Sequence, residues 1–443
     1  MRTLLFTILA IGPALGYNIL CIHKVPTKSH YHLLKGIVQP LLKSGHQVTL
    51  ITSFPDSKPT VNLTYIDVST TIKFFEDEFS NNPNPDTSLP SVLSFARKLT
   101  EKLAEMPAVA EVIVKGQFDA VVTEFFFSDL DSGKFFPIQE ESYKKHFGPL
   151  ASARGIALPP FEEAYTNVSI LFSNSHPTFA PGKSLPPNVV DIAGFHTGAT
   201  VQPLPEDLQE LLDSSSQGVI YFSMGSVVKS SQLIGKARKD LIELFGSMKQ
   251  TVLWKFDEDI QGLPKNVHIR KWMPQSSILA HPNLKVFITH GGLLSIIESL
   301  QHGVPLLAIP MFGDQPGNVY RSVAAGHALK VDFSPDMALE LKKALHEMLI
   351  NDKYHNKAKF LSNMYKKRPT PPSELIKHYI EIAIESKGAY HLRSPVKLYK
   401  WYELWMLDVI LAVLFILCMV YYVIKTIIKF VIQKFCSSKK KTQ

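Results

Sequence analysis

The stretch from Trp272 to Gln315 reads WMPQSSILAHPNLKVFITHGGLLSIIESLQHGVPLLAIPMFGDQ and decides the fold. Its run KVFIT, at 285–289, has the length and apolarity of a buried parallel strand. Two glycines follow, and then an apolar-periodic segment, 293–300, runs to a His-Gly helix stop. Residues 304–309 form a second buried-strand run. The pattern predicts a strand, a tight turn, a helix and a strand, which together make one βαβ unit.

The Gly291-Gly292 turn lies where α/β proteins bind phosphates, because backbone N–H groups and the positive end of a helix meet there. His290, just before the turn, can donate a hydrogen bond to a diphosphate. Glu298 can reach ribose hydroxyls, and the pair Asp314-Gln315 offers acceptors and donors for sugar hydroxyls. Such turns are common in parallel sheets, so His290 alone is read equally well as a helix cap.

The order of these motifs resembles the signature of the UDP-glycosyltransferase family. The matching elements are Trp-x-x-Gln, Thr-His-Gly-Gly, Glu, Gly-Val-Pro, Ile-Pro and Asp-Gln, all within 272–315. Vertebrate members carry Asn-Gly where this chain has Leu294-Ser295, so the chain looks like the invertebrate, especially insect, branch. The resemblance implies an α/β fold of two Rossmann-like domains of the GT-B type. It also implies a UDP-sugar co-substrate, UDP-glucose rather than UDP-glucuronate, and neither cofactor nor metal.

The resemblance further implies a role for each residue of a donor site. Trp272 would stack on uracil, with Gln275 beside the base or ribose, and Glu298 would bind the ribose. The diphosphate would be held by His290, by Gly291 and Gly292, and by a second glycine turn at Gly225 and Ser226. Asp314 and Gln315 would bind the donor sugar.

A second βαβ pattern stands near the start of the chain. Residues 18–23 and 47–52 read as strands, and the helical pattern between them contains Pro40, which predicts a kink. His30 follows the first strand, and alone it is more readily a solvated loop histidine. The family has Ser-His at this place, so the resemblance implies that His30 is the catalytic base. An imidazole suits that task because its pKa lies near the operating pH.

An acidic residue after the predicted strand 118–123 would orient His30 and pair with its charge. Glu124 aligns best with the family's acid, and Asp129 is the competitor. For either residue alone, an ordinary solvated carboxylate is nearly as good an interpretation.

After Asp129 the chain departs from the family, because 131–158 is polar and weakly periodic. Relatives have a further helix, a strand and an acceptor loop there, so the N-terminal domain is expected to be shortened. Two hypotheses stay open. The protein transfers a sugar, with inversion, to a hydroxyl of a small lipophilic acceptor, or it is a non-catalytic UDP-sugar binder or regulatory partner of full-length relatives. Homo- or hetero-oligomers with such relatives fit the second hypothesis.

Composition excludes a nucleic-acid partner. The net charge of +8 includes Arg2 and six lysines in the C-terminal tail, and without them it falls to +1. A nearly neutral body lacks the basic face that nucleic-acid binding needs. Three cysteines, Cys21, Cys418 and Cys436, leave one in the body and therefore predict no intramolecular disulfide there.

Targeting signals predict a single-pass type I protein of the endoplasmic reticulum membrane. Residues 1–16 read as a signal peptide, 404–424 as a transmembrane helix and 425–443 as a basic cytosolic tail. The tail ends in a dilysine pair like a retrieval signal. Asn62 and Asn167 head glycosylation sequons. Between these segments we expect an acceptor-binding domain at 17–195 and a UDP-sugar-binding domain at 196–390.

Overall fold

The computed structural model describes residues 16–80, 89–124, 136–180, 182, 184–197, 201–225 and 235–439. Two predicted site residues, Asp129 and Ser226, lie outside the described residues, as do most of the predicted signal peptide and the dilysine pair. The chain divides into two units. The larger one runs to Ala389 without 186–188, and the smaller one comprises 186–188 and the residues from Tyr390 onward.

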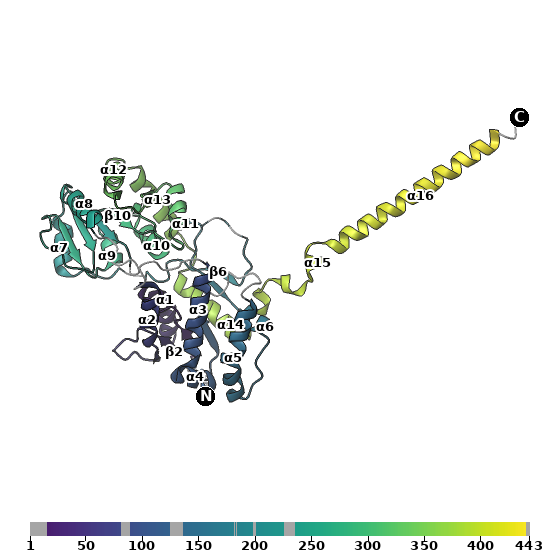
Figure 1. The fold of residues 1–443 in the computed structure, drawn as a ribbon, viewed down its shortest axis with the longest axis horizontal. Coiled ribbons are helices and arrows are strands. Elements are labelled where there is room, and N and C mark those ends of the chain that lie inside the picture. Colours follow the sequence, from purple (N-terminus) through teal and green to yellow (C-terminus); the bar gives the residue numbers. More distant parts are fainter. Residues whose placement is uncertain are drawn as a thin grey trace, which may run out of the picture. The chain divides into compact units, whose positions relative to one another are not determined.

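The first half of the larger unit is built around a parallel sheet with the strand order β3-β2-β1-β4. Strand β2 and the helices of this half are labelled in Figure 1. Its strands are β1 (Asn18–Ile22), β2 (Gln47–Thr52), β3 (Leu63–Asp67) and β4 (Ala120–Thr123). The helices of this half are α1 (Lys28–Lys43), α2 (Thr70–Phe75), α3 (Leu89–Glu105), α4 (Pro107–Lys115), α5 (Phe136–Arg154) and α6 (Phe161–Thr166). A separate pair of parallel strands, β5 (Leu171–Ser173) and β6 (Val189–Asp191), follows them.

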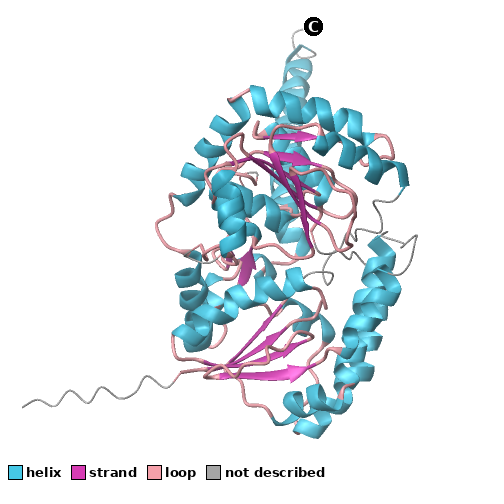
Figure 2. Ribbon diagram, turned by 90° about the vertical axis from the view of Figure 1, so that its left-hand side faces the viewer, coloured by secondary structure: helices cyan, strands magenta, loops and turns pink. Residues whose placement is uncertain are grey.

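The second half contains a six-stranded parallel sheet with the order β12-β11-β10-β7-β8-β9. Its strands are β7 (Val219–Ser223), β8 (Thr251–Lys255), β9 (Val267–Arg270), β10 (Leu284–Thr289), β11 (Leu306–Ala308) and β12 (Ala328–Lys330). Its helices are α7 (Glu206–Ser214), α8 (Gly235–Gly246), α9 (Gln275–Ala280), α10 (Leu293–His302), α11 (Gln315–Ala324), α12 (Met337–Ile350), α13 (Lys353–Lys366) and α14 (Pro372–Glu385). Strands alternate with helices, and helices flank both sheets (Figure 2). The predicted α/β fold with parallel sheets is confirmed.

Strand β7 shows why its sequence reads as an unbroken apolar run. Its residues are all buried, and successive side chains enter cores on opposite faces of the sheet. Tyr221 packs with α7, α9 and α10 in one core, whereas Phe222 packs with α8 and α12 in the other. A strand covered on both faces needs apolar residues at every position.

Helix α14 belongs to the core of the first sheet although it follows the second. Ile376 and Ile380 pack with Ile19 of β1 and Val38 of α1. The chain thus returns to the first half of the larger unit after the second sheet. Helix α1 continues through Pro40 and ends at Lys43, before Gly45, which has φ of 84°.

Two helical segments of the first half have no clear apolar pattern in the sequence. The polar, weakly periodic stretch 131–158 forms α5 over most of its described part, and the apolar residues of this helix follow no single stripe. Residues 76–80 form a π-helical turn, η1 (Glu76–Ser80), that continues α2. Strand β4 pairs with β1 and with no other strand among the described residues, and Val121 is 59% exposed. The first sheet therefore ends at an open edge.

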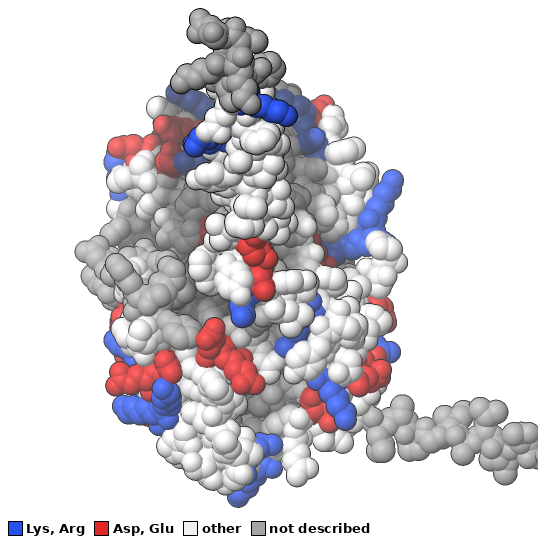
Figure 3. All heavy atoms as spheres, turned by 90° about the vertical axis from the view of Figure 1, so that its right-hand side faces the viewer, with Lys and Arg blue, Asp and Glu red and all other residues white. Residues whose placement is uncertain are grey.

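The smaller unit consists of short helical turns and one long helix. Its elements are η3 (Tyr390–Leu392), η4 (Pro395–Leu398), α15 (Trp401–Leu404) and α16 (Leu407–Lys439). The segment Leu407–Lys434 is long and apolar enough to cross a membrane. A stretch of 18 residues within it has a mean hydropathy of 2.7. Figure 3 shows mostly uncharged side chains along this helix. The helix is longer than predicted, because it continues beyond residue 424 through Lys425 and Lys429.

Candidate functional site

His30 and Glu124 meet at the carboxyl edge of the first sheet. His30 is the third residue of α1, and Glu124 directly follows β4. The Nδ1 atom of His30 contacts the Oε1 atom of Glu124, and the two side chains are 18% and 20% exposed. Both are therefore partly shielded but reachable from solvent. The predicted partnership of these two residues is observed, while the competing acid, Asp129, lies outside the described residues.

His290 stands between two glycine turns at the carboxyl edge of the second sheet. A Cβ atom on Gly225 would lie 2.6 Å from Cε1 of His290, and one on Gly292 would lie 2.5 Å from Nε2. Gly225 has φ of 80° and Gly291 has φ of 81°, which favour glycine at both positions. Two of the predicted diphosphate contacts, Gly225 and Gly292, thus lie against one imidazole, whereas a Cβ atom on Gly291 would meet Val319 instead.

The surroundings of His290 keep its ring neutral. Burial lowers the pKa of His290 to about 4, and the charge of Lys255 acts in the same direction. The Lys255 ammonium donates a hydrogen bond of 2.5 Å to the carbonyl oxygen of Gly225. Burial also lowers the pKa of Lys255, and the charge of Lys28 on α1 adds to this effect. A neutral ring can donate one hydrogen bond, and the nearby cation adds a positive charge that suits an anion.

Gln275 and Glu298 form the next part of the site. The Nε2 atom of Gln275 donates a hydrogen bond of 2.7 Å to Oε2 of Glu298 and one of 3.3 Å to Oγ of Ser295. Burial raises the pKa of Glu298 to about 7, although the hydrogen bond from Gln275 opposes this shift. Trp272 precedes them and is 69% exposed. An exposed indole is a suitable platform on which a heterocyclic base can stack.

Asp314 and Gln315 occupy different environments at the start of α11. Asp314 is exposed, whereas Gln315 is buried and its Oε1 atom accepts hydrogen bonds from the backbone N–H groups of Met311 and Phe312, at 2.9 and 3.2 Å. Gln315 therefore fixes the loop after β11. The carboxylate of Asp314 is free to face solvent, apart from its contact with Asn318.

The sequence-based reasoning missed Asn318. This buried side chain donates a hydrogen bond of 2.6 Å to Oδ2 of Asp314 and one of 3.5 Å to the carbonyl oxygen of Gly291. It thereby links the glycine turn to the predicted sugar contact. Its spacing of four residues from Asp314 was the available signal, because such residues are neighbours on a helix.

The two predicted glycosylation acceptors, Asn62 and Asn167, are both exposed. Asn62 has φ of 63° in the turn before β3. Glycosylation requires an accessible asparagine side chain. The modification of these two residues stays a prediction.

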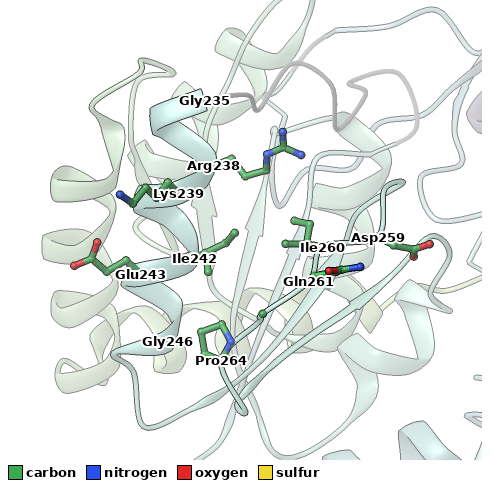
Figure 4. Close-up of a pocket in the computed structure, with 11 residues that line it drawn as sticks. Gly235, Arg238, Lys239, Ile242, Glu243, Gly246, Asp259, Ile260, Gln261 and Pro264 are labelled. Atoms are coloured by element: carbon green, nitrogen blue, oxygen red, sulfur yellow. The ribbon is translucent and has the colours of Figure 1, made fainter.

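A surface pocket of about 690 Å³ lies elsewhere on the second half of the larger unit, between α8 and the loop after β8 (Figure 4). Its described lining includes none of the predicted site residues. The guanidinium of Arg238 at its wall pairs with Glu258 at 2.8 Å, so this cation is already neutralised. The pocket offers no chemistry for the predicted reaction.

Comparisons with known proteins place this chain among glycosyltransferases. Residues 135–442 match the family model for UDP-glucoronosyl and UDP-glucosyl transferases. UDP-glucosyltransferase 2 of Dactylopius coccus is 29% identical, over 98% of this chain and 97% of that protein. Human UDP-glucuronosyltransferase 2B7 is 30% identical over 81% of this chain and 64% of that protein.

The alignment with the Dactylopius coccus enzyme spans 503 positions, which exceeds the 443 residues of this chain by 60. At least that many positions of the alignment have no counterpart in this chain.

Solved structures show the same fold at low sequence identity. Arabidopsis thaliana UGT89C1 complexed with quercetin has a TM-score of 0.59 and 16% identity, and the match covers 84% of this chain and 99% of that one. The glycosyltransferase VinC in complex with dTDP has a TM-score of 0.57 and 16% identity, over 83% of this chain and all of that one.

Proposed function

The chain belongs to the UDP-glycosyltransferase family, and from this premise we propose that it transfers glucose from UDP-glucose to a hydroxyl of a small lipophilic acceptor, with inversion. Membership of the family makes the protein an enzyme that transfers a sugar from a UDP-sugar to an acceptor. The choice of glucose rests on the insect-like Leu294-Ser295 motif and on the name of the Dactylopius coccus relative.

The contact between His30 and Glu124 carries the proposal. His30 accepts the proton of the acceptor hydroxyl while that oxygen forms a bond to the anomeric carbon of glucose. The bond from this carbon to the diphosphate breaks in the same step, and UDP leaves with the electron pair. The Glu124 carboxylate stabilises the imidazolium that forms on His30. Attack opposite the leaving group inverts the anomeric configuration.

The residues around His290 are proposed to receive the leaving diphosphate. His290 donates a hydrogen bond, the turns at 225–226 and 291–292 offer backbone N–H groups, and Lys255 adds a positive charge. Trp272 and Gln275 take the uracil, Glu298 the ribose, and Asp314 with Gln315 the sugar. The lack of a cofactor and a metal in this scheme stays a prediction.

The test is turnover by the full-length protein in microsomes, with UDP-glucose, UDP-glucuronate and UDP-galactose offered against a panel of phenols and plant alcohols. We expect turnover with UDP-glucose and a β-glucoside product by NMR. His30→Ala should lower kcat by about a thousandfold while UDP still binds. If the His30→Ala variant turns over at the wild-type rate, His30 is not the base.

A second candidate function is a UDP-sugar-binding partner of longer relatives. The 60 missing alignment positions and the open edge of β4 favour it, because a shortened acceptor lobe weakens catalysis and leaves backbone groups for pairing. UDP binding without turnover over the whole panel, together with altered activity of a co-expressed longer relative, would support this function instead.

The location is proposed to be the endoplasmic reticulum membrane, with the larger unit in the lumen and the tail in the cytosol. Helix α16 supports an anchor by its length and apolarity. Removal of glycans from Asn62 and Asn167 by endoglycosidase H, with protection of the body from added protease, tests the orientation.

A further inference from the structure

Asn318 is a buried side chain that touches two parts of the proposed donor site. It lies on α11 and is 4% exposed. Its Nδ2 atom donates hydrogen bonds to Oδ2 of Asp314, at 2.6 Å, and to the carbonyl oxygen of Gly291, at 3.5 Å. Its Oδ1 atom accepts a hydrogen bond of 2.5 Å from Nη2 of Arg321. The amide of Asn318 therefore has one partner for its oxygen and two for its nitrogen.

These three partners determine which way the amide of Asn318 is turned. An arginine guanidinium only donates hydrogen bonds, so the amide atom that faces Arg321 must be the oxygen. The Asp314 carboxylate and the Gly291 carbonyl only accept, so both require the amide nitrogen. A reversed amide would set its nitrogen against the guanidinium and its oxygen against two other oxygens. The orientation of the amide therefore follows from the chemistry of its partners.

The glycine turn after β10 also packs against α11 through an apolar contact. Val319, the next residue after Asn318, is fully buried. A Cβ atom on Gly291 would overlap Cγ2 of Val319 and would lie 3.6 Å from the carbonyl oxygen of Gln315. Gly291 thus lies directly against α11, and Asn318 supplies a polar contact within this packing.

The hydrogen bond to Gly291 determines where the next N–H group points. The carbonyl of Gly291 and the N–H of Gly292 belong to one planar trans peptide unit, in which they point in opposite directions. Because the carbonyl points to Asn318, the N–H of Gly292 points away from it. Gly292 is the N-cap of α10, and the first N–H groups of a helix have no partner within that helix. This N–H can therefore meet an anion.

Glycine on both sides makes this peptide unit easy to rotate. Gly291 has φ of 81°, and glycine adopts positive and negative φ about equally well. A rotated peptide would present its carbonyl oxygen, instead of the N–H of Gly292, to an anion. A diphosphate site on this turn therefore needs a contact that holds the carbonyl away from the anion, and Asn318 makes such a contact.

We propose that Asn318 is a positioning residue for both the diphosphate and the donor sugar. One hydrogen of its amide holds the peptide between Gly291 and Gly292, so that the N–H of Gly292 faces the diphosphate. The other hydrogen holds the carboxylate of Asp314 toward the sugar, and Arg321 keeps the amide in the orientation that both contacts need. This inference rests on the proposed roles of Gly292 and Asp314 in binding the UDP-sugar.

The test is isothermal titration of the purified full-length protein with UDP, with uridine measured by displacement of UDP. Asn318→Asp keeps the size of the side chain and removes both donated hydrogen bonds. We expect it to weaken UDP binding by about tenfold or more, because the N–H of Gly292 is no longer held toward the diphosphate. The affinity for uridine, which has no phosphate, should stay within about twofold of wild type.

Three further variants separate positioning from packing. Asn318→Ala removes the same donors without adding a charge, and it should act in the same direction. Arg321→Met removes the donor that orients the amide and should weaken UDP binding by a smaller factor. Ser322→Ala is the matched control, because Ser322 is buried on the same helix and its hydroxyl bonds to the main-chain oxygen of Asn318 at 3.1 Å. It should leave the affinity for UDP unchanged.

A double-mutant cycle with Asp314→Ala tests the contact on the sugar side. The readout is the affinity for UDP-glucose relative to that for UDP. Each single variant, Asp314→Ala and Asn318→Asp, should lower this ratio. The double variant should lower it no further than Asp314→Ala does, because the group through which Asn318 acts is gone.

These binding measurements distinguish failure of the inference from failure of the proposed function. If the wild-type protein does not bind UDP, the proposed donor site is wrong, and the role of Asn318 is wrong with it. If the wild-type protein binds UDP but Asn318→Asp keeps its affinity, or loses affinity for UDP and uridine equally, Asn318 does not position the turn and the donor site stands.

Discussion

A Cβ atom added to Gly292 would lie 2.5 Å from Nε2 of His290, a separation that real Cβ atoms do not show. The imidazole of His290 can therefore occupy its position only because residue 292 has no side chain. Gly225 bounds the same ring from the other turn. The two glycine turns of the second sheet serve one histidine, and its position depends on both.

The first prediction concerns this packing. Gly292→Ala should displace the His290 ring and weaken UDP binding at least tenfold, because the proposed hydrogen bond to the diphosphate is lost. Isothermal titration of the purified full-length protein with UDP measures the effect. Gly225→Ala should act in the same direction and should also lower stability, because φ of 80° is unfavourable for alanine.

Gly262→Ala is the control for backbone strain. Gly262 has φ of 72°, but a Cβ there meets no atom within 4 Å. This variant should lose about 1 kcal/mol of folding free energy and keep wild-type affinity for UDP. If it weakens UDP binding as much as Gly225→Ala does, contact with His290 is not the cause.

The second prediction concerns pH and Glu298. Burial raises the pKa of this carboxyl to about 7, well above its value in an unfolded chain. Between these two pKa values the folded state binds more protons than the unfolded state, so stability is full at low pH and falls as pH rises toward 7. In the absence of UDP, this loss of folding free energy amounts to roughly 3 kcal/mol. The Glu298→Gln variant should lose much less stability over the same pH range.

Thermal unfolding from pH 4.5 to 7.5 provides the measurement for Glu298. Glu210→Gln, which removes an exposed carboxylate on α7, serves as the comparison and should retain the wild-type slope. If Glu298→Gln also keeps the wild-type slope of stability against pH, another group causes the pH dependence.

The second sheet could be predicted from sequence because its strands are covered on both faces. Runs such as 219–222 (VIYF) and 286–288 (VFI) are apolar throughout, and the glycine turn after β10 is marked by two adjacent glycines. Most residues predicted to bind the UDP-sugar follow one another closely along the chain. Their order alone therefore predicted the site.

The first half of the larger unit was less predictable, because its important relationships are not local. Helix α5 has apolar residues on no single face, so periodicity gave no signal. Strand register, for example, brings Thr52 and Glu124 beside His23, although they lie 29 and 101 positions away along the chain. The π-helical turn after α2 begins with three acidic residues, Glu76, Asp77 and Glu78, which give no apolar periodicity.

The third prediction tests the length of the side chain at 124. Glu124→Asp keeps the charge but withdraws the carboxylate from His30 by one methylene group. It should lower kcat by roughly 10- to 100-fold, because small displacements of catalytic groups are costly, and it should leave UDP affinity unchanged. Asp119→Asn is the control. Asp119 lies before the same strand and accepts a hydrogen bond of 2.8 Å from the N–H of Asn18, at the opposite edge of the sheet. A similar loss of kcat in both variants would contradict a special role for Glu124.

The last prediction concerns α14, which connects the end of the larger unit to its first sheet. Ile376 is fully buried against β1 and α1, so Ile376→Ala should cost about 2–5 kcal/mol of stability. Hydrogen exchange should show faster exchange in β1 and α1 than in β7 and β10, because the lost contacts belong to the first core only. Ile350→Ala removes the same atoms from a side chain that is 65% exposed, and it should change stability by less than about 0.5 kcal/mol. Equal acceleration of exchange in both sheets would mean that the first core does not open independently, and that α14 stabilises the two halves as one cooperative unit.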